Sequence, residues 1–372
     1  MASIKSRVIC DDLLRRITSG DLCGVLMLPP EGKLAEAYAC SRPTVRKALA
    51  ELREAGYITG AKGSGSYIAA PARISQKDNA ETFLGIIFPN MGPEYFFDFL
   101  CNNLARHASE NGYSLVYGGY LSPKSEMLKT DIMRICDRYI AQKIKGVFFA
   151  PFGYHPKSDQ INKEIINSFS NAGIPVVLLD SNIERYPRPN NFDLVSLNHI
   201  QAGYVITEHL IERNARRLFF LAPSNSHHSV KLRFIGCRTA MTGGGIMPDE
   251  DIFVEIERDD ISRLSRFINE KKPDAILCSN DMTAMSVMQS LEKLGVKIPS
   301  DIMIAGFDNL SKVMLFSRSI TSIDQPIDDI SRAALNLMVE RMANPHKPVS
   351  QISFSGTLVT GESTILPRQP MY

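Results

Sequence analysis

Six short apolar runs within residues 82–372 constrain the fold of this chain more than any other feature. Amphipathic segments separate the runs. In one of these segments, Ile161, Ile165 and Phe169 follow the four-residue spacing of a helix. Near-continuous apolar strands that alternate with such helices are typical of parallel sheets covered on both faces. Because a stretch this long exceeds one lobe, we expect two α/β lobes. The apolar runs are residues 84–88, 146–150, 175–179, 218–222, 275–278 and 302–307.

Polar side chains stand at or just after the ends of several of these runs. Asp180, Asn280 and Asp308 are the clearest cases, and Arg233 lies on a helical segment after the fourth run. In open parallel sheets, ligands bind beyond the carboxyl ends of the strands. Ionised side chains make strong hydrogen bonds to hydroxyl groups. The pattern therefore predicts a cleft that binds a polyhydroxylated ligand.

Each of these residues also has a purely structural explanation. Asn280 or Asp281 suits the cap of the helix that begins there. Asp180 and Asp308 suit tight turns, and Arg233 suits an exposed surface. The residues alone leave both interpretations open, although their joint position at strand ends favours the cleft.

The N-terminal seventy residues have a different pattern of helices and a hairpin. Residues 3–18 and 31–39 carry apolar side chains at helical spacing, and Ser41 suits the N-cap of a third helix. Two glycines within residues 62–68 permit the positive φ of a tight hairpin. Residues 1–70 hold 10 Lys and Arg against 7 Asp and Glu, so this end is basic although the whole chain carries only +2. The third helix has an apolar stripe of Val45, Ala48, Leu49 and Leu52, and Arg42, Arg46 and Lys47 lie outside it.

Cations on the third helix favour nucleic acid as the partner of this region. Lys and Arg displace the counterions condensed on DNA, and Arg can bind guanine bidentately in the major groove. A three-helix module that binds a protein, with merely solvated cations, is the alternative. The glycine hairpin after the helix pair favours DNA.

Residues 28–68 resemble the GntR-type winged-helix repressors, whose pattern is Leu-Pro-Ser-Glu-x-x-Leu-Ala, then Ser-Arg-x-Thr-Val-Arg-x-Ala-Leu, then a Gly-x-Gly wing. Gly32 departs from the family, which usually has at this place an Arg that contacts DNA. The matching residues are Leu28, Pro29, Glu31, Leu34, Ala35, Ser41, Arg42, Thr44, Val45, Arg46, Ala48, Leu49, Leu52, Gly56, Gly63 and Gly65. The DNA-binding residues expected from the resemblance and the positive charge are Arg42, Thr44, Arg46, Lys47, Lys62, Gly63 and Gly65.

Residues 82–364 resemble the LacI/GalR-type repressors and, through them, the periplasmic sugar-binding proteins. Among the matching stretches are residues 84–89, 173–177, 273–276, 306–309 and 324–326. The resemblance implies two lobes joined by three chain crossings, and a homodimer. It also implies ligand contacts at Asp180, Arg233, Asn280, Asp308 and Gln325. Phe96, Phe97 and Phe152 are candidates for apolar contacts with a sugar ring, with core packing as the alternative role for at least one of them.

These observations predict a domain order. We expect a winged-helix DNA-binding domain over residues 1–69, a polar linker over 70–81 without apolar periodicity, and the two-lobed effector domain over 82–372. Chains with a GntR-type head and a LacI-type body resemble the arabinose-responsive repressor class. We predict a ligand-responsive transcriptional regulator that acts as a homodimer on double-stranded operator DNA, with a sugar or related metabolite as its effector.

The main alternative to a regulator is an enzyme, which catalytic, metal or cofactor motifs would indicate. The sequence has no phosphate-binding loop with Gly-Lys-Ser/Thr, no Gly-x-Ser-x-Gly and no His-Glu-x-x-His. We expect no enzyme activity, no cofactor and no metal site, and we interpret His227 and His228 as a surface loop. An enzyme that recognises sugars and carries an N-terminal partner-binding module remains the second hypothesis.

Cysteine usage and hydropathy predict the compartment. The seven cysteines are scattered, and no Cys-x-x-Cys occurs, which fits a reducing environment. No apolar run reaches the ~18 residues of a membrane span, and the N-terminus lacks an apolar export segment. We therefore expect a cytoplasmic protein rather than a transport receptor.

Overall fold

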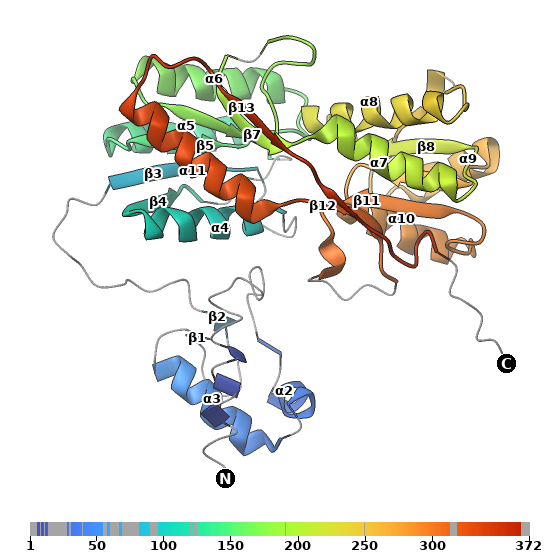
Figure 1. Ribbon diagram of the computed structural model, residues 1–372, viewed down its shortest axis with the longest axis horizontal. Helices are drawn as coiled ribbons and strands as arrows, with labels where there is room; N and C mark the ends of the chain where they lie inside the picture. The colour runs from blue at the N-terminus through green and yellow to red at the C-terminus, as the bar shows by residue number, and fades with distance from the viewer. Residues whose placement is uncertain are drawn as a thin grey trace. The chain divides into compact units, whose positions relative to one another are not determined.

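The computed structural model (Figure 1) divides into two compact units, Met1–Glu81 and Thr82–Tyr372. Each unit has its own apolar core. The predicted linker and residues 62–66 lie outside the described residues. The structure describes residues 6–7, 9–10, 12–13, 28–29, 31–38, 40–54, 58–59, 67–68, 82–89, 96–119, 121, 125–189, 191–248, 250–312 and 318–365.

The N-terminal unit contains the predicted helices and hairpin strands. Helix α2 (Glu31–Ala37) is followed by α3 (Arg42–Glu54), and β1 (Ile58–Thr59) pairs antiparallel with β2 (Tyr67–Ile68). The described residues between 6 and 13 are helical. The apolar stripe of α3 packs as predicted, because Val45, Ala48, Leu49 and Leu52 are buried with Ile9, Leu13, Leu28, Leu34 and Ile58.

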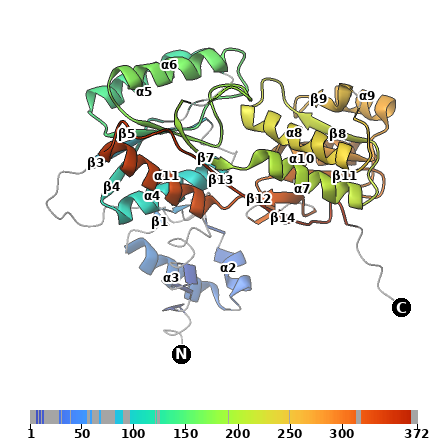
Figure 2. The same cartoon turned by 45° about the horizontal axis from the view of Figure 1, so that its top comes forward.

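The first lobe of the second unit is built on a six-stranded parallel sheet in the order β13-β7-β6-β5-β3-β4. Two apolar clusters cover its two faces. One cluster joins the sheet to α4 (Phe96–Glu110) and α11 (Ile327–Ala343), and the other joins it to α5 (Leu128–Ala141) and α6 (Ser158–Asn171). Figure 2 shows α5 and α6 on the face opposite α4 and α11. The strands are β3 (Thr82–Ile87), β4 (Tyr113–Tyr117), β5 (Gly146–Phe149), β6 (Val176–Leu179), β7 (Asp193–Leu197) and β13 (Gln351–Phe354).

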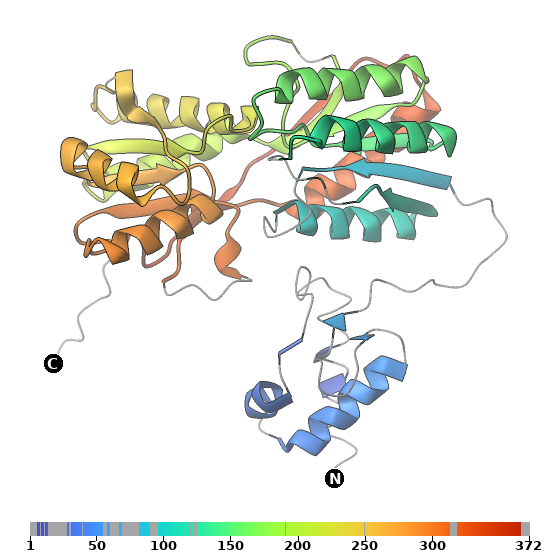
Figure 3. The same ribbon diagram turned by 180° about the vertical axis from the view of Figure 1, so that it is seen from behind.

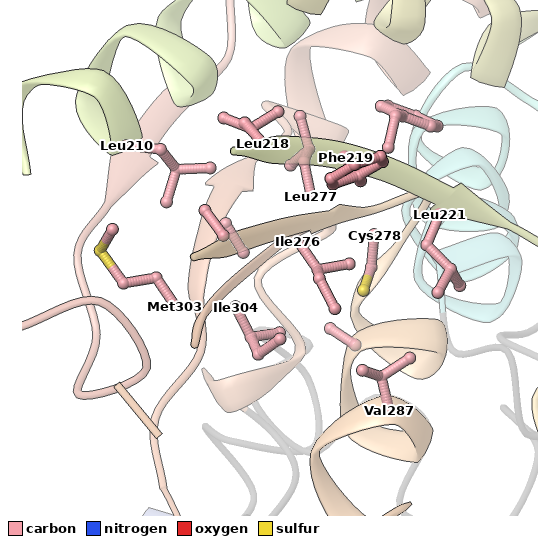
Figure 4. Packing of buried hydrophobic residues seen from close by; sticks show 14 of the residues in the cluster. Leu210, Leu218, Phe219, Leu221, Ile276, Leu277, Cys278, Val287, Met303 and Ile304 are labelled. Atoms are coloured by element: carbon pink, nitrogen blue, oxygen red, sulfur yellow. The ribbon is translucent and has the colours of Figure 1, made fainter. Parts of the chain in front are cut away.

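The second lobe has the strand order β14-β12-β11-β10-β8-β9, and β14 runs antiparallel to β12 at the edge. Its core is one apolar cluster, in which side chains of the central strands interdigitate with Val287 (Figure 4). The strands are β8 (Leu218–Ala222), β9 (Phe253–Glu255), β10 (Ala275–Cys278), β11 (Met303–Phe307), β12 (Thr321–Asp324) and β14 (Thr357–Val359). The helices are α7 (His199–Glu212), α8 (His228–Gly243), α9 (Ile261–Lys271) and α10 (Asp281–Lys293), with short 3₁₀ turns η1 (Glu250–Ile252) and η2 (Leu310–Lys312).

Three chain crossings join the lobes, after β7, after β12 and after β13. Figure 3 shows the two sheets side by side with the crossing segments between them. The predicted fold class, two parallel α/β lobes with three crossings, is therefore confirmed, and all six predicted apolar runs form strands. In the part of the chain that the structure describes, no helix is both long and apolar enough to span a membrane.

Candidate functional site

A cavity lies between the two lobes, beyond the carboxyl ends of β6, β10 and β11. Its volume is about 40 Å³, which holds only a few water molecules. Ligand pockets commonly enclose about 300–1,000 Å³, so a ligand can bind only when the lobes part or side chains withdraw. Six of the eight predicted ligand residues line the cavity, namely Phe96, Phe97, Asp180, Arg233, Asn280 and Asp308.

Asp180 is the acidic residue that the first lobe contributes to the cavity. It ends β6 in the left-handed region with φ 65°, and its buried carboxylate accepts a hydrogen bond from Ser229 Oγ of the second lobe at 2.9 Å. Burial by itself raises the pKa of Asp180, but the neighbouring His199 and Arg233 outweigh burial and hold this pKa well below its usual range. Asp180 is therefore an ionised acceptor that already bonds across the cleft.

His199 lies between Asp180 and Arg233 and sets the geometry of both. Arg233 Nε donates to His199 Nδ1 at 3.3 Å, so this nitrogen carries the lone pair. The proton is then on Nε2, which donates to the backbone oxygen of Asp180 at 2.8 Å. The imidazole is buried, so His199 orients the arginine from behind the cavity wall.

Arg233 is the cation of the cavity, and it is fully buried. Its Nη1 donates to the backbone oxygen of Ser279 at 2.6 Å, and its Nη2 lies 3.8 Å from Asp308 Oδ1. The guanidinium carbon also lies 4.5 Å from the centre of the Phe307 ring, a cation–π contact. These contacts hold the arginine in one position before any ligand binds.

Close packing of α7 against α8 puts Arg233 within reach of His199. A Cβ at Gly203 would lie 2.0 Å from the backbone oxygen of Arg233, and a Cβ at Gly236 would lie 2.0 Å from that of Ile200. Only glycine lets the two helix backbones approach this closely.

Asp308 and Gln325 form a pair at the second crossing. Gln325 Nε2 donates to Asp308 Oδ1 at 2.7 Å. Among the described residues Gln325 Oε1, although buried, has no hydrogen-bond partner. A buried acceptor without a partner is costly, but Gln325 is not among the residues that line the cavity.

The sequence left open whether Asn280 and Asp281 have structural roles, and the structure shows that both do. Asn280 caps α10, because its Oδ1 accepts from Thr283 N at 2.9 Å, yet it also lines the cavity. Asp281 is fully buried and accepts from Leu310 N and Ser322 Oγ, both at 2.8 Å. Burial, together with nearby Asp308, raises the pKa of Asp281 well above its usual value.

Phe152 is not at the cavity, where the sequence resemblance had placed it. Its ring is buried in the core of the first lobe, 6.2 Å from that of Phe149 between ring centres. Asn162 bonds both backbone polar groups of Phe152, at 2.8 Å and 3.0 Å. Phe96, another predicted ring contact, lines the cavity beside Phe97, and so does Tyr154, which was not predicted.

The prediction of a surface loop at His227 and His228 is wrong for His227. His227 is buried, lines the cavity and contacts the Tyr154 ring edge-on at 4.9 Å. His228 is partly buried and bonds to Asp159 and Asn182 of the first lobe. The two histidines therefore belong to the junction between the lobes.

Three of the predicted DNA-binding side chains of α3, Arg42, Arg46 and Lys47, are exposed, and Thr44 is half-buried. The hydroxyl groups of Thr44 and Ser41 share a hydrogen bond of 2.8 Å. Arg46 pairs with Glu31 of α2 at 2.9 Å, and this pairing is the largest cause of the raised pKa of Arg46 and of the lowered pKa of Glu31. The predicted wing residues Lys62, Gly63 and Gly65 lie outside the described residues.

Arg42 also lies against the backbone of α2. A Cβ at Gly32 would lie 3.0 Å from Arg42 Nη2. The absence of a side chain at Gly32 therefore makes room for the guanidinium of Arg42.

Comparison with known families accounts for both units. Residues 5–68 match the family described as bacterial regulatory proteins, gntR family. Residues 207–364 match the family described as periplasmic binding protein-like domain. The chain joins a gntR-family helix-turn-helix domain to a periplasmic binding protein-like domain.

Relatives of this regulator match most of its chain. The arabinose metabolism transcriptional repressor of Geobacillus stearothermophilus is 23% identical over 343 residues, which are 88% of each chain. The solved transcription regulator CcpA of Lactococcus lactis has a TM-score of 0.64 at 18% identity, and the match covers 77% of this chain and 100% of that one. The transcriptional regulator CelR in complex with cellobiose has a TM-score of 0.63 at 19% identity, covering 93% and 94%.

The residues not found from the sequence include Ser229 and Tyr154, which line the regulator's cavity, and His199, which lies behind its wall. His199 is the first residue of α7 and Ser229 lies in the first turn of α8. Their positions next to a chain crossing and at the start of a helix were the sequence features that could have indicated a role at the cavity. Their partners, however, are distant along the chain, so spacing alone could not pair them.

Proposed function

We propose that this ligand-responsive DNA-binding repressor takes its effector into the cavity between the lobes and reads operator DNA with α3. One observation carries the proposal. A regulatory helix-turn-helix domain is joined to two lobes whose strand ends present Asp180, Arg233, Asn280 and Asp308 to one cavity. We place its action in the bacterial cytoplasm, where operator DNA is found.

The charge of the cavity supports an uncharged polyhydroxylated effector. Two carboxylates, Asp180 and Asp308, face one guanidinium, and Arg233 already donates to Ser279 and His199. A phosphate group would add two negative charges to a site that is already acidic, whereas hydroxyl groups can donate to the two carboxylates. Thermal-shift titration with L-arabinose, D-ribose and cellobiose, each against a phosphorylated sugar, tests this preference. Stabilisation by the phosphates alone would contradict it.

Replacement of Asp308, the carboxylate that the second lobe contributes to the cavity, tests whether the effector binds there. Asp308→Ala removes the acceptor that Gln325 binds and one partner of Arg233. We expect the variant to bind operator DNA as the wild type does and to lose its response to effector, with effector affinity lower by about 2–3 kcal/mol. Fluorescence anisotropy of labelled operator, selected from a random duplex pool, measures both properties. A normal effector response in this variant would place the site elsewhere.

Loss of a cation on α3 tests the DNA interface. Arg46→Ala should weaken operator binding by about 1–3 kcal/mol if the side chain reads a base. Arg53→Ala, in the last turn of the same helix, provides the matched control. Equal effects of the two variants would mean that α3 acts only through its general charge.

We further propose that the regulator acts as a homodimer. A two-fold assembly presents two copies of α3 to the two halves of a near-palindromic operator. Sedimentation equilibrium, with and without operator, measures the assembly. A monomer that binds its operator with full affinity would contradict this proposal.

A further inference from the structure

The segment that leads into α8 bonds to the first lobe independently of any ligand. Tyr154 N donates to Asn225 O at 2.5 Å, and His227 Nδ1 donates to Pro151 O at 3.0 Å. His228 adds two further contacts, described below. The lobes cannot part at this side of the cavity without breaking these bonds, so the segment controls access to the small cavity.

His228 is placed between two groups that can only accept hydrogen bonds. Its Nδ1 lies 3.1 Å from the backbone oxygen of Asn182, and its Nε2 lies 3.2 Å from Asp159 Oδ1. A neutral imidazole has one N–H and satisfies one of these acceptors. An imidazolium has two and satisfies both. Both acceptors therefore receive a hydrogen bond only when His228 is protonated.

We propose that His228 and Asp159 form a pH-sensitive clamp that holds the two lobes closed over the effector cavity. The clamp is made from one residue of each lobe, His228 at the start of α8 and Asp159 in the first turn of α6. Its regulatory meaning rests on the proposed effector site, because closure of these lobes is what would retain an effector. His228 is a positioning residue here, since it acts on the lobes rather than on the ligand.

The charges around His228 determine whether a fall in pH tightens or loosens the clamp. Asp159 favours the imidazolium, and it also accepts from Arg185 at 2.7 Å through its other oxygen. Lys231 is the next cation along α8 and lies over the Phe253 ring at 3.4 Å. Lowering the pH favours the imidazolium form of a histidine, which is the form that donates to both acceptors. The clamp therefore tightens as the pH falls and loosens as the pH rises.

Hydrogen–deuterium exchange of the ligand-free full chain tests the clamp. His228→Gln retains one amide donor but gains none on acidification, and it is compared with the wild type at the same pH, so intrinsic exchange chemistry cancels. At pH 5.5 we expect peptides that contain Tyr154 and residues 223–228 to exchange about three- to tenfold faster in the variant. At pH 7.5 the two proteins should exchange at nearly equal rates. A difference of the same size at both pH values, or none at pH 5.5, overturns the proposal.

Two further variants separate the clamp from general stability. In Asp159→Asn the new amide can donate to a neutral His228 Nε2, so the pH dependence should disappear or reverse. His346→Gln changes an exposed histidine between α11 and β13 and should match the wild type at both pH values. An unchanged pH dependence in Asp159→Asn overturns the pairing. Because no effector or DNA is present, failure of the clamp and failure of the proposed function are separate results.

Discussion

At the scale of single residues, the cavity depends on how each buried charge is balanced. Arg233 remains a buried cation because it bonds to His199 and Ser279 and lies near Asp308. Removing one partner of a buried charge is far more costly than removing an exposed ion pair. The pair between Arg46 and Glu31 is of the exposed kind, so little folding stability depends on it. Under the proposed function, Arg46 exchanges Glu31 for DNA.

Asp98 provides a pH-dependent prediction at this scale. Burial in the first turn of α4 raises the pKa of Asp98 to about 6, above its value in the unfolded chain. The folded state then binds the proton more tightly than the unfolded state, so this contribution to stability is greatest below pH 4 and is lost as the pH rises through 6. Asp98→Asn should therefore stabilise the protein at pH 8 by about 1–2 kcal/mol, after the favourable helix N-terminus is subtracted.

Thermal unfolding of wild type and Asp98→Asn at pH 4 and pH 8 measures this effect. The two proteins should unfold alike at pH 4 and differ at pH 8. A variant that is less stable than the wild type at pH 8 would show that the ionised carboxylate has a favourable partner.

Polar residues at strand ends could be predicted from the sequence, but their partners could not. The position of Asp180 and Asp308 follows from the parallel topology, because every buried strand directs its carboxyl end to the same edge. The bonds of Asp180 to Ser229 and of His228 to Asp159 depend on how the two lobes meet. Local spacing carries no information about that contact.

At the scale of elements, strands were found from the sequence only where burial is complete on both faces. The run that became β5 is buried at every position, so it reads as an unbroken apolar segment. The edge strand β13 alternates exposed and half-buried residues, and β4 is half-buried along most of its length. Such edge strands have no long apolar run, and short strands of this kind resemble loops in sequence.

The contact between α7 and α8 supports a prediction about packing. A Cβ at Gly236 would lie 2.0 Å from the backbone oxygen of Ile200, so Gly236→Ala must push the helices apart. We expect the free energy of unfolding to fall by about 1–3 kcal/mol. The effector response should weaken as well, because α8 carries Arg233 and α7 begins at His199. Chemical denaturation measures the first effect, with the exposed Arg238→Ala on α8 as control.

A Gly236→Ala protein with wild-type stability would show that the helices do not approach so closely in solution. A protein that is destabilised but responds normally to effector would show that Arg233 tolerates the displacement.

At the scale of the whole molecule, the proposed effector cavity and the proposed DNA-binding helix belong to different units of the chain. The cavity lies within residues 96–310 and α3 is Arg42–Glu54, so no cavity residue belongs to the N-terminal unit. Linkage requires that an effector which changes operator affinity by some factor has its own affinity changed by operator by the same factor. A coupling of about 1–3 kcal/mol, or about 5–150-fold, is usual.

Lengthening the segment over residues 70–81 tests how this coupling is carried. An insertion of about ten Gly and Ser residues barely alters either site, and the added loop entropy costs only about 0.6 kcal/mol per doubling of length. If the effector acts by fixing the spacing of the two heads in a dimer, operator affinity should fall by roughly threefold while the effector-dependent factor approaches one. Titration of operator with and without effector, and of effector with and without operator, measures both sides of the linkage. An undiminished factor in the lengthened chain would mean that head spacing is not what the effector controls.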